Sequence, residues 1–255
     1  MIPTVELGDT GILVSELCFG SGTNGWSGNS NQTRLGKDFF VDLLIYAFEK
    51  GIRFWDSADQ YGSHEHVKAA IREVGRENVV FTTKTCATTR QEAEKDLERY
   101  LRETGTDCLD IVLMHCLTKP DWPTQQSEVM EVLDEAKRKG ILRAHGVSCH
   151  DFGAFQSAAK EPWVDVVLSR INHSGVHMDA SVPEVIEVMA DMHARGKGIY
   201  GMKVCGAGQL TDDIFKSLAF VRELDCVDAM TIGMCSRAEI DENFRFFEEH
   251  ALVGV

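Results

Sequence analysis

Positive charge, proline, paired cysteines and long apolar runs are all scarce in this chain of 255 residues. Its 26 Lys and Arg face 40 Asp and Glu, a net charge of −14, which argues against general binding to nucleic acid or anionic membranes, since such binding needs clustered basic residues. No long apolar run is present, so no membrane-spanning helix is expected, and the opening MIPTVELGDTG does not resemble a signal peptide. The remaining composition, 44% hydrophobic with 5 prolines, is typical of one globular domain, expected to span residues 1–255.

The 8 cysteines never form a C-x-x-C pair, which excludes the usual zinc, iron–sulfur and thioredoxin-like spacings. The histidines show no spacing that would bring metal ligands together, so no metal is expected. Most cysteines lie within apolar runs, as in Leu17-Cys18-Phe19, where a free thiol packs as a small apolar side chain. Reduced cysteines favour a cytoplasmic protein.

Short apolar runs alternate with longer amphipathic runs along the chain, which is the pattern of a parallel sheet covered by helices. Several of the short runs are apolar at consecutive positions, as expected for strands buried on both faces. Eight strands and eight helices predict an α/β fold, a (β/α)8 TIM barrel. The expected strands are 17–20, 52–55, 79–84, 109–115, 141–148, 164–169, 199–203 and 227–233, and the expected helices are 37–50, 63–75, 89–104, 124–139, 151–160, 181–195, 211–223 and 236–250.

Turn and capping residues agree with this order of elements. Gly8-Asp9-Thr10-Gly11, within residues 5–17, predicts a β-hairpin ahead of the first barrel strand, placed to close the barrel floor. Thr88 or Thr89 is expected to begin one helix, and Ser181 with Glu184 predicts a capping box at the start of another.

Active sites of TIM barrels lie at the C-terminal ends of the strands, so polar residues at those positions are candidates. Asp56 follows Ile52–Trp55, Lys84 ends the next expected strand, and His115 ends the strand after that. Tyr61 lies in the loop five residues after Asp56. A single Asp or His at a strand end is more often a turn or partly buried residue, but three adjacent strands here place an acid, a base and an imidazole at one rim.

These four side chains suit the protonation of an oxygen that develops negative charge. We expect the Lys84 cation to lower the pKa of Tyr61, and the Asp56 carboxylate to keep Lys84 charged against burial. His115 could hydrogen-bond a substrate carbonyl and orient it beside Tyr61. Such a reaction needs a hydride donor that the protein itself lacks, which a nicotinamide cofactor would supply.

A G-x-G-x-x-G pattern at Gly20–Gly25 is not read as a dinucleotide fingerprint, because a loop rather than a helix follows it. It is read instead as a loop at the barrel mouth whose Gly22 and Thr23 approach a cofactor. Phosphate sites on barrels usually follow the seventh and eighth strands. The residues there that are expected to bind pyrophosphate are Lys203, Gly206 and Gly208 after the seventh strand, and Met234, Ser236 and Arg237 after the eighth, where a helix begins.

The chain resembles the aldo-keto reductases over nearly its whole length. FWDSADQYGSHE resembles the segment with that family's catalytic Asp and Tyr, here Asp56 and Tyr61, while TTKT and IVLMHC carry the matching Lys84 and His115. The resemblance implies hydride transfer from NADPH or NADH to a small carbonyl compound, with the cofactor bound first and Asp56 beside it. It also implies that Ser148 and Cys149 hold the nicotinamide carboxamide, and that Glu242 and Asn243 contact adenine.

Two departures from the family pattern concern the cofactor. Cys149 stands where an Asn is usual, and Glu239 stands where NADP-specific members carry a basic residue. Glu239 argues toward NAD, NADP is the family default, and the preference between them stays open. The similarity is to short, monomer-type, bacterial-like members without a long C-terminal loop, and the oligomeric state stays open. Substrate binding is then expected from Trp26 and Trp122 together with Tyr61 and His115.

Two other hypotheses remain open from the sequence. A protein of the same fold could bind the cofactor as a redox sensor or scaffold with negligible turnover. An unrelated phosphate-binding barrel, an aldolase or isomerase, would instead use Lys84 to form a Schiff base.

Overall fold

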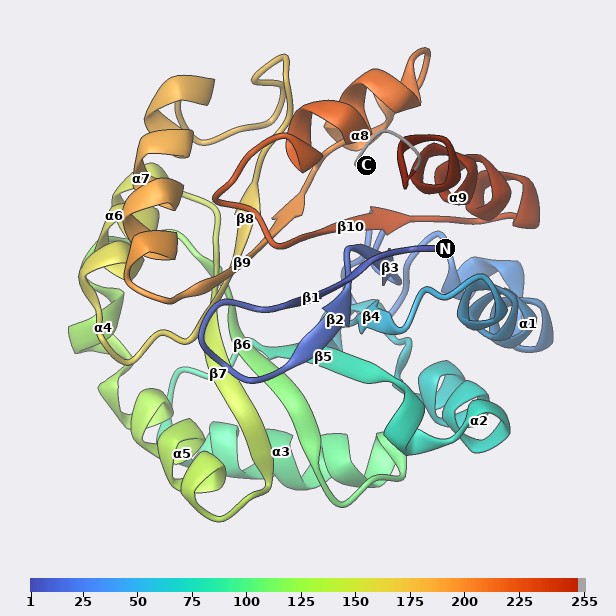
Figure 1. Cartoon of the computed structure of the whole chain (residues 1–255). Coiled ribbons are helices and arrows are strands. Elements are labelled where there is room, and N and C mark those ends of the chain that lie inside the picture. The colour runs from blue at the N-terminus through green and yellow to red at the C-terminus, as the bar shows by residue number, and fades with distance from the viewer. Residues whose placement is uncertain (252–255) are drawn as a thin grey trace.

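A closed barrel of eight parallel strands forms the centre of the protein in the computed structural model, which describes residues 1–251 (Figure 1). The strand order around the barrel follows the chain, and the last strand pairs with the first, Met230 opposite Leu17. This confirms the predicted (β/α)8 architecture. Residues 252–255, which the expected domain 1–255 includes, lie outside the described part. The barrel strands are β3 (Leu17–Gly20), β4 (Phe54–Asp56), β5 (Val80–Thr85), β6 (Leu109–Leu117), β7 (Leu142–Cys149), β8 (Val166–Arg170), β9 (Gly198–Met202) and β10 (Ala229–Gly233).

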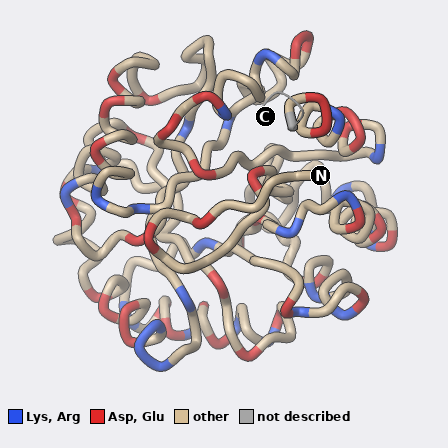
Figure 2. Tube along the Cα trace, viewed as in Figure 1, with Lys and Arg blue, Asp and Glu red and all other residues tan. Residues whose placement is uncertain are grey.

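Helices surround the barrel and bury their apolar faces against it (Figure 1). The predicted capping box of Ser181 with Glu184 is present, and the helix expected to begin at Thr88 or Thr89 begins at Thr89, which forms a second capping box with Glu92. Charged residues lie mainly on the outer helices and loops (Figure 2). The helices are α1 (Lys37–Glu49), α2 (His64–Val74), α3 (Arg90–Thr104), α4 (Trp122–Gln125), α5 (Ser127–Arg138), α6 (Phe152–Lys160), α7 (Val182–Ala194), α8 (Ile214–Arg222) and α9 (Arg237–Ala251).

One expected helix, 124–139, is wrong as a single element. The chain forms the short α4 and then α5, with a break at Gln126, whose φ of −120° is not helical. Pro123 lies in the first turn of α4, where a missing N–H costs nothing.

The predicted hairpin is present as β1 (Thr4–Glu6) and β2 (Leu13–Ser15), which lie across one end of the barrel (Figure 1). Leu7, Ile12 and Val14 join the apolar cluster inside the barrel, while a larger cluster fills the space between strands and helices. Gly8 has a φ of +52°, and a Cβ there would lie 2.3 Å from the backbone nitrogen of Gly198, so the hairpin packs too closely for any side chain at this turn. The floor of the barrel is thereby closed, which leaves the opposite end for a site.

Among residues 1–251, no helix is long and apolar enough to cross a bilayer.

Candidate active site

Three neighbouring strands bring Asp56, Lys84 and His115 to the open end of the barrel. Asp56 ends β4, Lys84 lies near the end of β5, and His115 lies near the end of β6. The strand register pairs Asp56 with Thr82 and Lys84 with Leu113. Lys84 thus lies two residues beyond the partner of Asp56 on the next strand, and His115 lies two residues beyond the partner of Lys84. The sequence-based expectation that these strand ends converge agrees with this arrangement.

Lys84 and Asp56 form a buried ion pair. The Lys84 ammonium is fully buried and donates to Asp56 Oδ2 at 2.7 Å and to the Ser57 carbonyl at 2.6 Å. The other carboxylate oxygen, Oδ1, accepts a hydrogen bond from the buried Tyr200 hydroxyl at 2.8 Å. Burial lowers the pKa of Lys84, and the groups around it, Asp56 first among them, raise it, with a net upward direction. A charged, paired lysine is a poor nucleophile, which argues against the Schiff-base hypothesis.

Tyr61 lies over this pair and beside His115. Its hydroxyl is 3.4 Å from His115 Nε2, and Lys84 Nζ is 4.9 Å from the centre of its ring. The ring packs on the β3–α1 loop, where a Cβ at Gly22 or Gly25 would lie within 2.5 Å of it. Gly22 and Gly25 of the G-x-G-x-x-G pattern therefore make room for Tyr61, which gives them a packing role in this loop.

The pKa of Tyr61 departs from the expectation. Burial raises it, and the Lys84 cation lowers it by less, so the net direction is above the ordinary value rather than below. The expected net decrease is wrong because the sequence could not show how completely the phenol is desolvated. Tyr61 therefore keeps its proton at neutral pH.

His115 is neutral over the physiological range. Burial, followed by the Lys84 cation and His150, lowers its pKa from 6.5 to about 2. Its Nδ1 lies 3.8 Å from the Cys86 sulfur, whose pKa burial raises to about 11. The thiol thus stays protonated and can act only as a weak donor to Nδ1.

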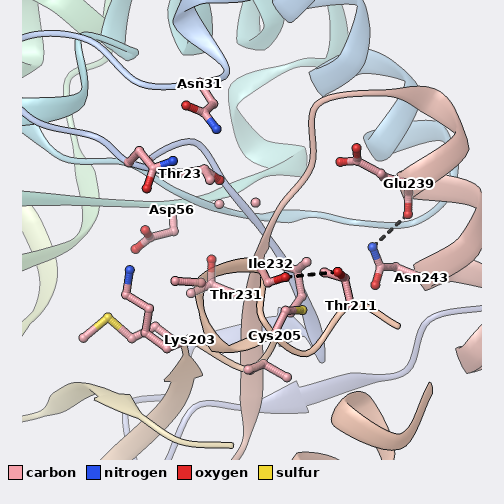
Figure 3. A pocket seen from close by; sticks show the side chains of 18 of the residues that line it. Thr23, Asn31, Asp56, Lys203, Cys205, Thr211, Thr231, Ile232, Glu239 and Asn243 are labelled. Carbon is pink, nitrogen blue, oxygen red and sulfur yellow. Dashed lines mark hydrogen bonds between the residues drawn. The ribbon is translucent and has the colours of Figure 1, made fainter. Parts of the chain in front are cut away.

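A cavity of about 550 Å³ extends from this group to the start of α9 (Figure 3). Asp56 and Lys203 lie on one side of it, and Glu239 and Asn243 on the other. Asn243 Nδ2 bonds to the Glu239 carbonyl, while its buried Oδ1 has no partner among the described residues. The predicted cofactor residues that line the cavity are Gly22, Thr23, Asp56, Lys203, Gly208, Glu239, Glu242 and Asn243.

The other predicted cofactor residues lie outside this lining. Cys149 and Met234 are buried in the apolar core, and the Gly206 amide already bonds to the Lys203 carbonyl. Ser236 Oγ accepts from the Glu239 amide, and the Arg237 guanidinium lies 4.8 Å from the centre of the Tyr46 ring. Ser148 is buried, and its Oγ has no partner within residues 1–251.

The two tryptophans expected at the substrate site differ. Trp26 is 52% exposed and its ring lies 6.1 Å from that of His115, so it borders the mouth. Trp122 is 2% exposed, donates to the Ala154 carbonyl and lies against Trp163. The placement of Trp122 corrects the expectation, because α4 turns its indole into the core and away from the cavity.

Several residues at this end were missed by the sequence analysis, notably Tyr200, Arg170 and Cys86. Arg170 lies two residues from the inward-facing Leu168 on β8, and Tyr200 lies two residues from Met202 on β9. Cys86, one residue past the end of β5, lies two residues from Lys84. Counting this alternation along the strands could have found them. Within the described residues, no group of His, Cys, Asp and Glu is arranged to hold a metal ion.

Comparison with known proteins agrees with this geometry. The aldo/keto reductase family model matches residues 16–225. A Glycine max protein named probable aldo-keto reductase 1 is 34% identical over 158 residues, 58% of this chain and 45% of its own length. The NADH-specific methylglyoxal reductase of Escherichia coli is 23% identical over 193 residues, 65% of this chain and 58% of its own. These relatives are thus matched over about half of their length.

A solved structure extends the likeness over almost the whole barrel. It is that of a Pseudomonas aeruginosa protein classed as an aldo-keto reductase, with a TM-score of 0.81 and 25% identity, covering 96% of this chain and 95% of that one. The strand order, the four converging side chains and the extent of the family match lead to one conclusion. This chain belongs to the aldo/keto reductase family.

Proposed function

We propose that this chain is an oxidoreductase that uses NADH or NADPH to reduce a small carbonyl compound at Tyr61. The observation that carries the proposal is the convergence of Tyr61, His115 and the buried Lys84–Asp56 pair at one end of the cavity. At this point a phenol can donate a proton, a neutral imidazole can hold the acceptor oxygen, and a fixed cation can stabilise the phenolate that remains.

The cavity suits an extended dinucleotide. Asn243 Oδ1 is a buried acceptor without a partner at one end, which fits the amino group of an adenine. The amides of Arg237 and Ala238 begin α9 with no hydrogen bond among the described residues, and such amides favour phosphate. Ser148 Oγ, unpartnered at the end of β7, fits a carboxamide. When bound with its nicotinamide near Asp56, the cofactor supplies the hydride that the carbonyl carbon accepts.

Tyr61 then donates the proton. Its raised pKa keeps the phenol protonated until negative charge develops on the carbonyl oxygen. The O–H bond breaks toward that oxygen, and the Lys84 ammonium stabilises the phenolate that remains. Asp56, held by Tyr200, keeps that ammonium charged and in position.

His115 orients the carbonyl. Because it is neutral, only one ring nitrogen carries a proton, and the Cys86 thiol beside Nδ1 favours the tautomer with the proton on Nε2. That N–H and the Tyr61 hydroxyl, 3.4 Å apart, together bind one carbonyl oxygen. Trp26, exposed at the mouth, provides an apolar contact for the rest of the substrate.

Glu239 favours NADH. Its carboxylate accepts the Cys235 amide at 2.7 Å and so lies at the start of α9, beside the amides suited to phosphate. A negative charge at that position repels an additional ribose phosphate and can accept a ribose hydroxyl.

The experiment that tests this function has two stages. Titration with NADH and with NADPH, followed by the fluorescence of Trp26 and the other tryptophans, is expected to show saturable binding. Reduction of a panel of aldehydes is then expected in the unaltered chain and to be lost in Tyr61→Phe, which should still bind cofactor. Tyr46→Phe is the matched control, because the Tyr46 hydroxyl bonds to Asp241 on the outside of the barrel. Full activity in Tyr61→Phe would contradict the mechanism, and binding without any turnover would favour the sensor hypothesis.

A further inference from the structure

Positively charged side chains gather at the rim on the side of His115 that lies away from Asp56. Going round the ring from His115 on β6, His150 follows β7, Arg170 ends β8 and Lys203 follows β9. Arg170 pairs in register with Met202, so Lys203 lies one position beyond it on the neighbouring strand. Four consecutive strand ends thus place two imidazoles, a guanidinium and an ammonium along the rim.

The Arg170 guanidinium is partly neutralised. One nitrogen donates to Asp179 Oδ1 at 2.8 Å, another donates to His150 Nδ1 at 2.7 Å, and the buried Nε has no partner among the described residues. Burial, followed by Arg170 and Lys203, lowers the pKa of His150 to about 4, so His150 accepts this bond as a neutral ring. The His150 and His115 rings are 6.5 Å apart, so the neutral His150 ring lies between His115 and the Arg170 guanidinium that bonds to it.

Lys203 has no compensating charge. It lines the cavity, and its ammonium makes no hydrogen bond or ion pair within residues 1–251. Burial lowers its pKa, and the Arg170 cation lowers it further. Lys84 is paired with Asp56 and Arg170 with Asp179, so one positive charge remains unmatched at this rim. A partly buried cation without a partner is costly, and a bound anion would relieve that cost.

The position of the Lys203 side chain in the cavity shows which end of the cavity it faces. This side chain lies on the same side of the cavity as Asp56, away from Glu239 and Asn243 (Figure 3). Glu239, in the first turn of α9 that begins with the proposed phosphate-binding amides, lies on the other side of the cavity (Figure 3). The ammonium therefore faces the position of the substrate more than that of the cofactor phosphates.

We propose that the carbonyl substrate carries an anionic group, a carboxylate or a phosphate, that Lys203 and Arg170 bind while Tyr61 and His115 hold the carbonyl oxygen. This inference rests on the proposed reductase function. Arg170 on β8 and Lys203 after β9 lie two and three strands round the barrel from His115 on β6, and neighbouring strands are about 4.8 Å apart. This separation favours an aldehyde with a distal acid over a 2-oxo acid.

Matched substrates test the proposal. The carboxylate arm compares kcat/KM for 4-carboxybenzaldehyde with that for methyl 4-formylbenzoate, which has the same skeleton without the charge. The phosphate arm compares 4-formylphenyl phosphate with 4-methoxybenzaldehyde. We expect the unaltered chain to prefer the anion in at least one arm, and the arm with the larger preference identifies the anion.

Variants then show which residue causes the preference for the anionic substrate. Lys203→Met should lower the ratio of kcat/KM for anion over neutral substrate about tenfold to a hundredfold, the value of a hydrogen bond to a charged group. Lys203→Arg should retain most of that ratio. Lys119→Met, which removes an exposed charge from the loop after β6, is the control and should leave the ratio unchanged.

The ratio of kcat/KM for the anionic over the neutral substrate tests this inference separately from the proposed function. Reduction of neutral aldehydes without any preference for an anion would overturn the inference and leave the reductase intact. Loss of cofactor affinity in Lys203→Met with an unchanged ratio would assign Lys203 to the cofactor instead. Absence of turnover with every aldehyde and both cofactors would refute the proposed function, and the inference with it.

Discussion

The buried pair of Lys84 and Asp56 predicts a strong energetic coupling between the two residues. Removing one partner leaves the other charge buried without compensation, which costs about 3–5 kcal/mol of the free energy of unfolding. In Lys84→Met the carboxylate keeps only the Tyr200 hydroxyl, and in Asp56→Asn the ammonium keeps the Ser57 carbonyl but loses its counter-charge. The double variant buries neither charge, so we expect it to be more stable than the sum of the single losses predicts, by about 2–3 kcal/mol.

Urea unfolding of the four proteins at pH 7 measures this coupling, provided that the slopes with denaturant agree. Arg138 and Asp134 supply the control cycle, because they form an exposed pair on α5 with 70% and 47% of their side chains accessible. Their coupling should be about 0.3–0.5 kcal/mol. If the losses for Lys84 and Asp56 add to within about 0.5 kcal/mol, the two side chains are not a coupled ion pair and the reasoning fails.

Three further predictions concern the cofactor, the pH dependence of stability and the core. Glu239→Arg should improve the Kd for NADPH relative to that for NADH by about tenfold or more, and Glu239→Gln by less; an unchanged ratio would show that this residue does not face the additional phosphate. Because the pKa of His115 is about 2 in the folded protein and 6.5 in its reference state, the unfolded chain binds an extra proton below pH 6.5, and stability should fall as the pH falls. Between pH 6.5 and 4 this residue should lower the free energy of unfolding by about 3 kcal/mol, at roughly 1.4 kcal/mol per pH unit. Urea unfolding of His115→Gln over the same range should therefore show a loss of stability about 3 kcal/mol smaller than that of the unaltered chain. Trp122→Phe should lower the free energy of unfolding by about 1–2 kcal/mol and leave KM unchanged, whereas Trp26→Ala should raise KM. A Trp122→Phe variant with changed KM and unchanged stability would contradict the place of Trp122 in the core.

The barrel was predictable because its signals are local. Apolar strands, the turn at Gly8 and the capping boxes at Thr89 and Ser181 each depend on neighbouring residues, and all of them agree with the structure. The break at Gln126 was missed because the amphipathic pattern runs through it without interruption.

The candidate site was predictable in part. Strand-end position alone selected Asp56, Lys84 and His115, since parallel strands in a barrel all end at one rim. Tertiary packing decided the rest: the direction of the Trp122 indole, the desolvation that raises the pKa of Tyr61, and the bond from Tyr200 to Asp56 across 144 residues. None of these follows from spacing along the chain.

The closure of the ring by its last strand has a consequence for how the protein is made. On a ribosome, Asp56 and Lys84 emerge 28 residues apart, but the Tyr200 that covers Asp56 follows 144 residues after it, about 7–30 s later at ordinary rates of synthesis. The strand β10, which pairs with β3, is later still. A nascent chain therefore exposes the edges of an incomplete sheet, together with two charges destined for burial, for most of its synthesis. Chaperone demand and sensitivity to truncation should both be greatest in this interval, before the first and last strands meet.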